Sequence, residues 1–277
     1  MQTIQAVIMG AVQGISEFLP ISSSAHIVFS SAIYKILTGS AIQNVGSEEI
    51  FFDILIHLAS LLAVIIFFFK DLKEIISGFF NGLIRKDYEN PEFKTGVFVL
   101  LATFITCVLA FFIKDVAHSL VENPVYVSIL LLFTGCILFF SEKLKRKEKN
   151  MDFKTAIFIG LAQGLAVFPG LSRSGLTIAT GIFNGIERTK AARFSFILSV
   201  PIIIIASLIY PILEINPAEI HTFNFKAMAL GCIASFATGF FCIKYFMKFL
   251  EKFNLKCFAY YCWIMGILMI FISVKFG

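Results

Sequence analysis

The chain has 277 residues, of which 58% are hydrophobic and 15% are charged, and its mean hydropathy is +0.88. Soluble globular domains are about 45–50% apolar, so this composition excludes a soluble domain and indicates an integral membrane protein. The net charge of +5 comes from clusters between apolar runs, with no basic stripe of interleaved aromatic residues. It therefore indicates cytoplasmic loops and not a nucleic-acid partner.

Six apolar runs are long enough to cross a bilayer, since a spanning helix needs about 20 apolar residues. In chain order they lie at about 51–69, 95–113, 124–141, 194–213, 225–246 and 257–274. Two further apolar stretches, about 2–35 and 153–186, are each interrupted by a loop rich in Pro, Ser and Gly. Non-helical backbone is tolerated at membrane depth only inside protein or beside a wet cavity. We therefore predict an all-α membrane protein with six transmembrane helices and two re-entrant helix–loop–helix hairpins.

The two interrupted stretches are related by a shift of 150 residues. The matched pairs are Gly10 and Gly160, Gln13 and Gln163, Gly14 and Gly164, Phe18 and Phe168, Ser22 and Ser172, and Ser24 and Ser174. The chain is then a single membrane domain, 1–277, made of repeats at about 1–142 and 152–277. Each repeat holds one hairpin and three spans. Because three is odd, the second copy enters the membrane from the opposite side, which is an inverted-topology repeat.

The distribution of lysine and arginine predicts the orientation. If the hairpins do not cross the membrane, most of these residues fall on the side opposite the N-terminus. Cytoplasmic loops carry the excess of positive charge, so both termini face outward. We expect a multi-pass protein of the bacterial cell (inner) membrane. The first hairpin then enters from the periplasmic or extracytoplasmic side, and the pocket opens there.

The first hairpin carries the segment QGISEFLPISSSAH, which runs from Gln13 to His26. Ionisable groups at membrane depth are costly and are therefore functional candidates. Gln13 and Glu17 are four residues apart and share a helix face, and Pro20 ends that helix. Glu17 fits a general base, a metal ligand or the partner of an arginine. His26 fits a general acid or base.

Three serines follow the helix break, and one of them would be a nucleophile if a base lies within reach. They are Ser22, Ser23 and Ser24. Their spacing does not distinguish the nucleophile from residues that cap the next helix.

The second hairpin carries the segment PGLSRSGLT at 169–177. Arg173 lies within an apolar stretch and needs a negative partner there. A guanidinium, hydroxyl groups and free N–H groups at a helix start together suit a phosphate group. The hydroxyl groups belong to Ser172, Ser174 and Thr177. A simpler interpretation is that Arg173 only pairs with Glu17 to join the hairpins, but such a pair would not explain the serines and glycines of both loops.

Other polar residues carry weaker signals. Ordinary roles at the membrane interface are favoured for Glu48, Glu49, Asp53 and His57, and His118 and His221 are predicted to lie in short outer loops.

With these motifs identified, the sequence resembles the undecaprenyl-diphosphate phosphatase family, the bacitracin-resistance proteins of the BacA type. The resemblance rests on Gln13-x-x-x-Glu17 with FLPISSSAH, on PGLSRSGLT, and on FSFILSVP at 194–201, and it covers essentially the whole chain. It implies the same six spans and two re-entrant hairpins. It also implies a hydrolase that removes the terminal phosphate of a C55 polyprenyl diphosphate. This reaction recycles the carrier lipid for cell-wall synthesis and confers bacitracin resistance.

The resemblance implies roles for the residues at the motif positions. The implied catalytic residues are Glu17, Ser23 as nucleophile, His26 as acid or base, and Arg173 on the diphosphate. The implied substrate-binding residues are Gln13, Ser22, Ser24, Ser172, Ser174 and Thr177. A divalent cation, Mg²⁺ or Ca²⁺, would be held partly by Glu17. Many members have Glu where this chain has Gln13, and glutamine cannot act as a base, so the catalytic role falls on Glu17.

The resemblance also implies the partners. They are the polyprenyl diphosphate lipid and the bilayer, while bacitracin would compete indirectly by sequestering the substrate. A homodimer is the assembly to test.

Two alternatives remain open from the sequence. Phosphate release would proceed through attack by Ser23 or through direct attack by water. A lipid-carrier flippase or an anion transporter would use the same arginine and N–H groups, because broken helices in inverted repeats are typical of transporters.

Overall fold

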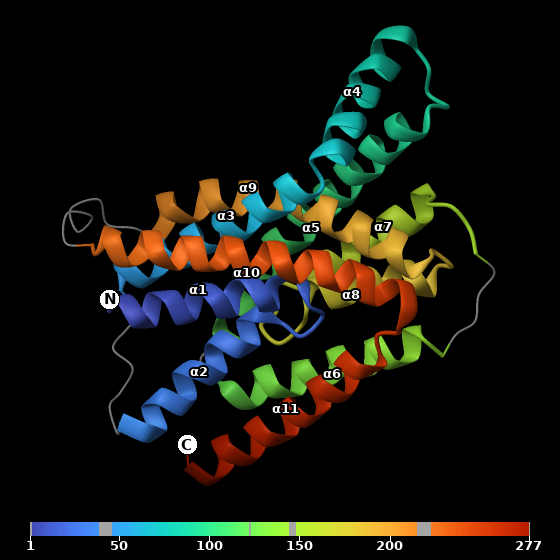
Figure 1. The fold of residues 1–277 in the computed structure, drawn as a ribbon. Coiled ribbons are helices and arrows are strands. Elements are labelled where there is room, and N and C mark those ends of the chain that lie inside the picture. Colours follow the sequence, from blue (N-terminus) through green and yellow to red (C-terminus); the bar gives the residue numbers. More distant parts are fainter. Residues whose placement is uncertain (1, 39–45, 122, 144–147, 215–222, 277) are drawn as a thin grey trace.

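The computed structural model describes residues 2–38, 46–121, 123–143, 148–214 and 223–276. These residues form eleven α-helices and no strand (Figure 1). The helices are α1 Thr3–Phe18, α2 Ser23–Thr38, α3 Ser47–Phe67, α4 Phe69–Arg85, α5 Pro91–Val121, α6 Pro124–Ser141, α7 Phe153–Leu165, α8 Arg173–Phe183, α9 Arg188–Glu214, α10 Phe225–Lys252 and α11 Lys256–Phe276.

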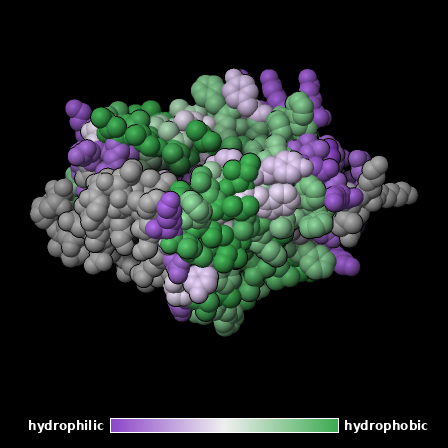
Figure 2. Space-filling view, turned by 90° about the horizontal axis from the view of Figure 1, so that it is seen from below, coloured by the Kyte–Doolittle hydropathy of each residue, from purple (hydrophilic) through white to green (hydrophobic). Residues whose placement is uncertain are grey.

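Six of these helices are long and apolar enough to cross a membrane: α3, α5, α6, α9, α10 and α11. Each one overlaps a span that the sequence predicts, so the all-α prediction with six transmembrane helices is confirmed. Figure 2 shows hydrophobic residues across the middle of one face, with hydrophilic residues gathered toward its ends. The chain is a multi-pass membrane protein.

The two interrupted stretches form helix–loop–helix units. The pair α1 and α2 is joined by residues 19–22, and the pair α7 and α8 by residues 166–172. These helices have 16, 16, 13 and 11 residues, so each is shorter than the roughly 20 residues that a span needs. The re-entrant path of the hairpins stays a prediction.

Matched glycines of the two hairpins make matched helix contacts. Helix α1 packs against α10, and a Cβ atom at Gly10 would lie 2.0 Å from the backbone oxygen of Gly231. Helix α7 packs against α5, and a Cβ atom at Gly160 would lie 2.8 Å from the backbone oxygen of Ala102. Each hairpin thus packs closely on a span of the other half of the chain, while the inverted topology of the repeat stays a prediction. The repeat boundaries themselves stay a prediction.

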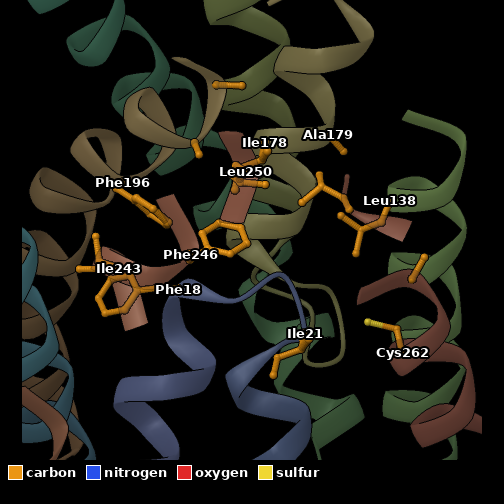
Figure 3. Close-up of a cluster of buried hydrophobic side chains, with 14 of the residues drawn as sticks. Phe18, Ile21, Leu138, Ile178, Ala179, Phe196, Ile243, Phe246, Leu250 and Cys262 are labelled. Atoms are coloured by element: carbon orange, nitrogen blue, oxygen red, sulfur yellow. The ribbon is translucent and has the colours of Figure 1, made fainter. Parts of the chain in front are cut away.

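A shared hydrophobic core holds the two hairpins together (Figure 3). Phe18, at the end of α1, is fully buried and packs edge-on against Phe196 of α9, with ring centroids 5.6 Å apart. Ile21 of the first loop and Ile178 of α8 belong to the same cluster, as does Phe246 of α10. The first loop and helix α8 therefore share one apolar core.

Loops from three places in the chain meet at one end of the bundle. The Glu142 carboxylate follows α6 and accepts hydrogen bonds from Arg188, the first residue of α9. It also accepts the backbone N–H of Leu255, which precedes α11, at 3.0 Å. The sequence assigns all three segments to the cytoplasmic side, and the structure brings them together.

Helix α4 was not predicted, because its apolar residues alternate with charged ones and do not form a spanning run. It projects from the bundle together with the first turns of α5 (Figure 1). The two helices pack through a close approach of Gly82 to Phe93, and the Phe79 and Phe93 rings stack with centroids 5.5 Å apart. Neither helix segment contributes to the site described next.

Candidate active site

Both hairpin loops end at the start of a helix, and both helices are capped by a serine. The Ser22 hydroxyl, just before α2, accepts the N–H of Ala25 at 3.4 Å. The Ser172 hydroxyl, just before α8, accepts the N–H of Gly175 at 3.1 Å. Such caps satisfy one of the free N–H groups at a helix start and leave the others available. The two helix N-termini both border the same small cavity, and this arrangement favours an anion.

The two loops also bind each other through their backbones. The Ser174 hydroxyl donates to the carbonyl oxygen of Leu19 at 3.0 Å, and the N–H of Gly170 donates to the Ser24 hydroxyl at 3.4 Å. In each direction, a serine in the first turn of the second helix of one hairpin contacts the loop backbone of the other hairpin. The loops are therefore positioned relative to one another independently of any charged pair.

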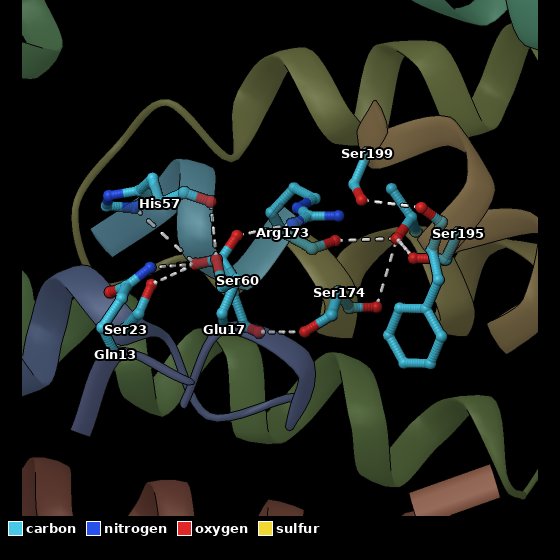
Figure 4. Close-up of polar contacts among 12 residues, drawn as sticks. Gln13, Glu17, Ser23, His57, Ser60, Arg173, Ser174, Ser195 and Ser199 are labelled. Carbon is cyan, nitrogen blue, oxygen red and sulfur yellow. Dashed lines mark hydrogen bonds and ion pairs between the residues drawn. The ribbon is translucent and has the colours of Figure 1, made fainter. Parts of the chain in front are cut away.

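Glu17 lies at the centre of the polar contacts between the hairpins (Figure 4). Arg173 Nη2 donates to Glu17 Oε1 at 2.6 Å. Ser23 Oγ and Gln13 Nε2 both donate to Glu17 Oε2, at 3.0 and 2.9 Å. The Glu17 and Arg173 side chains are only 9% and 16% exposed, so this ion pair is largely removed from solvent. Buried charges of this kind need such partners.

Two atoms of this cluster are buried with no hydrogen-bond partner among the described residues: Arg173 Nη1 and Gln13 Oε1. A buried polar group without a partner is costly and requires an explanation. The first is a donor that suits a phosphate oxygen, and the second is an acceptor that suits a cation. Both lie on side chains bound to Glu17, so an anion and a cation would each find an unused group there.

The cavity between the loops has a volume of about 200 Å³. Six residues singled out in the sequence line it: Glu17, Ser22, Ser23, Ser24, Ser172 and Arg173. The rest of the lining is Ser16, His57, Ala166, Val167 and Leu171. The structure therefore brings the first and second motifs together at one polar pocket.

Three of the remaining sequence candidates support the pocket without lining it. Gln13 is fully buried and contacts Glu17. Ser174 binds the other loop, as described above. The Thr177 hydroxyl bonds to the Arg173 carbonyl oxygen at 2.8 Å and to the Ser195 hydroxyl at 2.6 Å, so it joins the start of α8 to α9.

Among the described residues, no hydrogen bond or ion pair joins His26 to Glu17, Ser23 or Arg173. Its Nδ1 lies 2.8 Å from the Ser22 carbonyl oxygen, and its Nε2 lies 2.7 Å from the Tyr261 hydroxyl on α11. The hydrogen bonds of His26 therefore do not reach the pocket carboxylate, as the acid–base role expected from the sequence would require.

His57 of α3, by contrast, lines the pocket, although the sequence favoured an ordinary interface role for it. Its Nε2 lies 3.8 Å from Glu17 Oε2. Its Nδ1 lies 2.8 Å from the Asp53 carbonyl oxygen, which only accepts, so Nδ1 carries the proton. No spacing signal links His57 to the first motif, because the two are joined only by the fold. The side chain of His118 and all of His221 lie outside the described residues.

The hairpins align without a gap in sequence but differ in chemistry. The 150-residue shift matches Glu17 with Val167 and Ser23 with Arg173. Ser23 and Arg173, the first residues of α2 and α8, therefore hold equivalent positions, and both bind the single carboxylate. The two matched hairpins therefore supply different groups to the site: the first supplies the Glu17 carboxylate and the Ser23 hydroxyl, and the second supplies the Arg173 guanidinium.

The oxygen atoms at this site fit a hard cation better than a transition metal. Among the described residues, no three His, Cys, Asp or Glu side chains cluster to hold a metal ion by themselves. Mg²⁺ is commonly held by one or two carboxylates together with the phosphates of a substrate. The Glu17 carboxylate and Gln13 Oε1, which has no partner among the described residues, are oxygen atoms of the kind that such a cation prefers.

Comparison with known proteins agrees with these motifs. Residues 6–268 match the family model described as bacitracin resistance protein BacA. The chain is 39% identical over 286 residues to an undecaprenyl-diphosphatase of Methanosphaera stadtmanae, with 98% of each chain covered. It is 36% identical over 286 residues to an undecaprenyl-diphosphatase of Methanobrevibacter smithii, with 99% of each covered. It is also 38% identical over 280 residues to undecaprenyl-diphosphatase 2 of Halalkalibacterium halodurans, covering 98% of this chain and 96% of the relative. Since the match spans nearly the whole chain, the protein belongs to the BacA family of bacitracin-resistance proteins.

Proposed function

We propose that this chain is an undecaprenyl-diphosphatase. It hydrolyses the terminal phosphate of a C55 polyprenyl diphosphate and yields undecaprenyl phosphate and inorganic phosphate. The product is the carrier lipid of cell-wall synthesis, so its recycling accounts for bacitracin resistance. The observation that carries this proposal is the Glu17–Arg173 pair in a polar pocket between two helix N-termini, inside an apolar bundle.

Diphosphate binding is assigned to Arg173 and the two helix starts. Arg173 uses Nη2 for Glu17, which leaves the unpartnered Nη1 for a phosphate oxygen. Charge-assisted N–H bonds and the positive ends of two helices would stabilise the negative charge of the head group. The hydroxyl groups of Ser22, Ser24 and Ser172 line the same pocket and supply further donors. Phosphoryl transfer depends mainly on such positioning and charge stabilisation.

The nucleophile is assigned to Ser23. Its hydroxyl already donates to Glu17 Oε2 at 3.0 Å, so the carboxylate can take the proton as Ser23 Oγ attacks the terminal phosphorus. The bond from phosphorus to the bridging oxygen breaks, and undecaprenyl phosphate leaves with the electron pair. Water then hydrolyses the phosphoserine, which releases phosphate and restores the hydroxyl.

A divalent cation, Mg²⁺ or Ca²⁺, is assigned to Glu17 and Gln13 Oε1 together with the substrate. When bound, it would neutralise part of the diphosphate charge. Gln13 has no acid–base role, and Glu17 alone among the cluster residues carries a carboxylate.

The orientation proposed from the sequence places the end of the bundle where Glu142 and Arg188 meet in the cytoplasm. The first hairpin then enters the cell membrane from the outer face without crossing it, and the pocket opens to that face. This arrangement would let the prenyl tail stay in hydrocarbon while the head group reaches water. Bacitracin would act on the substrate and not on this protein, and a homodimer is the assembly to test.

The deciding experiment measures phosphate release from C15 and C55 prenyl diphosphates by the purified protein in detergent, with and without Mg²⁺. We expect cation-dependent release by the wild type and its loss in both Glu17→Ala and Arg173→Ala. Folding of each variant is checked by thermal unfolding, because breaking a buried ion pair costs stability. If the well-folded wild type released no phosphate with any cation, the proposed phosphatase activity would be wrong. Lipid or anion movement across vesicles would then identify a transporter.

A further inference from the structure

His26 is held at both ring nitrogens. Because the Ser22 carbonyl oxygen only accepts, His26 Nδ1 donates to it across 2.8 Å. In the neutral ring, Nε2 then accepts the proton of the Tyr261 hydroxyl across 2.7 Å. The two rings stack with centroids 5.7 Å apart and planes at 8°. With both nitrogens occupied, His26 has no free atom for a proton of the substrate.

The carbonyl that His26 holds belongs to a residue in an unfavourable backbone conformation. Ser22 has φ +67°, in the left-handed region that residues other than glycine rarely adopt. Ser22 directly precedes Ser23, whose hydroxyl binds Glu17. The backbone at Ser22 therefore decides where the Ser23 side chain points. A residue held in such a conformation persists only where its surroundings fix it.

The second hairpin provides an internal comparison. Ser172, the counterpart of Ser22, has an ordinary φ of −78°. The 150-residue shift matches His26 with Leu176, which is apolar and 4% exposed. The histidine thus occurs on the hairpin with the left-handed serine and is replaced by leucine on the hairpin without it. A general requirement of the hairpin fold would have placed a polar group in both.

Two neighbouring residues of helix α11 form hydrogen bonds with the first hairpin, at and just after its loop. Tyr261 binds His26, and the Cys262 thiol donates to the carbonyl oxygen of Pro20 at 3.6 Å. Pro20 and Ser22 lie on either side of Ile21, which is buried in the shared core. The loop that precedes Ser23 is therefore fixed from α11.

We propose that Tyr261 and His26 are positioning residues: Tyr261 orients the His26 ring, and His26 holds Ser22 in its left-handed conformation so that Ser23 points at Glu17. This inference rests on the proposed function for its kinetic test. It removes His26 from proton transfer and gives a function to Tyr261, a residue that the sequence motifs do not include.

The kinetic test compares His26→Asn with His26→Ala, because the asparagine amide can donate to the Ser22 carbonyl from the position of Nδ1. We expect His26→Ala to lower kcat about 100-fold with KM nearly unchanged, as a misplaced reacting group does. His26→Asn should recover most of this loss. Tyr261→Phe should lower kcat several-fold in the wild type and have no further effect in His26→Ala. If His26→Asn is as impaired as His26→Ala while the wild type is active, the positioning role is wrong and the proposed function stands.

A stability cycle tests the same inference without turnover. Glycine adopts positive φ freely, so Ser22→Gly removes the conformational cost that His26 offsets. The drop in Tm caused by His26→Ala should therefore be smaller in the Ser22→Gly background than in the wild type. Equal drops in both backgrounds would show that His26 does not hold this conformation. This readout remains valid even if the protein releases no phosphate.

Discussion

Glu17 and Arg173 are 156 residues apart in the chain, yet Arg173 Nη2 lies 2.6 Å from Glu17 Oε1. Each residue comes from a different hairpin, and each has a further atom that the contact between them does not use. Glu17 accepts the Ser23 hydroxyl, and Arg173 keeps Nη1 without a partner among the described residues. The pair can therefore link the hairpins and also take the proposed role in substrate binding, because the two roles use different atoms.

The variant Arg173→Lys tests whether the site needs only a positive charge at this position or also the two separate nitrogens of the guanidinium group. Lysine carries the charge as a single ammonium group, so it cannot hold Glu17 with one nitrogen and the phosphate with another. We expect kcat/KM to fall roughly 10- to 100-fold, with Tm closer to the wild type than in Arg173→Ala. Steady-state phosphate release and thermal unfolding measure the two effects. The matched control is Arg188→Lys, in the ion pair with Glu142 at the end of the bundle, which should leave kcat/KM unchanged. If Arg173→Lys were as active as the wild type, Arg173 would not need one nitrogen for Glu17 and another for the phosphate.

The three serines of the first loop should differ sharply in effect. Ser23 alone among them contacts Glu17, whereas Ser24 bonds to Ser22 and to the N–H of Gly170. We expect Ser23→Ala to lower turnover about 1,000-fold or more and Ser24→Ala less than about tenfold. Acid quenching with substrate labelled in the terminal phosphate should trap phosphoserine in the wild type and not in Ser23→Ala. Near-normal turnover by Ser23→Ala would instead establish direct attack by water.

Gln13 and Gln163 form a matched pair for testing the cation. Gln13 Nε2 binds Glu17, whereas Gln163 Nε2 binds Thr106 at 3.1 Å on the other side of the repeat. Both amide oxygens are buried without a partner among the described residues, so replacing either with leucine removes a similar group. We expect Gln13→Leu to raise the Mg²⁺ concentration for half-maximal activity about tenfold and Gln163→Leu to leave it unchanged. An equal response of the two variants would rule out Gln13 as a cation ligand.

His57 should act as a polar contact for the head group, since it lines the pocket with Nε2 toward Glu17. Glutamine places an amide near the position of Nε2 and does not titrate, while alanine removes the contact. We expect His57→Ala to lower kcat/KM about tenfold, mainly through KM, and His57→Gln to retain most of the activity. A loss in His57→Gln as large as in His57→Ala would instead show that the imidazole itself is required.

The sequence predicted the parts of this structure that depend on hydrophobic length and on breaks in it. The six spans, the two interrupted helices and the meeting of Glu17 with Arg173 follow from apolar runs, from Pro20 and from the cost of an isolated charge in a membrane. Helix α4 was missed because it is amphipathic and borders a span. Nearness in sequence to Glu17 favours His26 over His57, but it does not determine which face of a helix meets a pocket. His26 turns toward α11, and His57 reaches the carboxylate from α3.

The matched glycines predict matched losses of stability. A Cβ atom at Gly10 or at Gly160 would meet the backbone of the facing helix, so alanine at either position must push α1 from α10 or α7 from α5. Such overpacking typically costs about 1–3 kcal/mol. We expect Gly10→Ala and Gly160→Ala each to lower Tm in detergent. Gly46→Ala is the control, because its Cβ would meet only the end of the Glu49 side chain, at 3.0 Å. If Gly160→Ala left Tm unchanged while Gly10→Ala lowered it, the two hairpins would not share one packing role, and the structural argument for the repeat would fail.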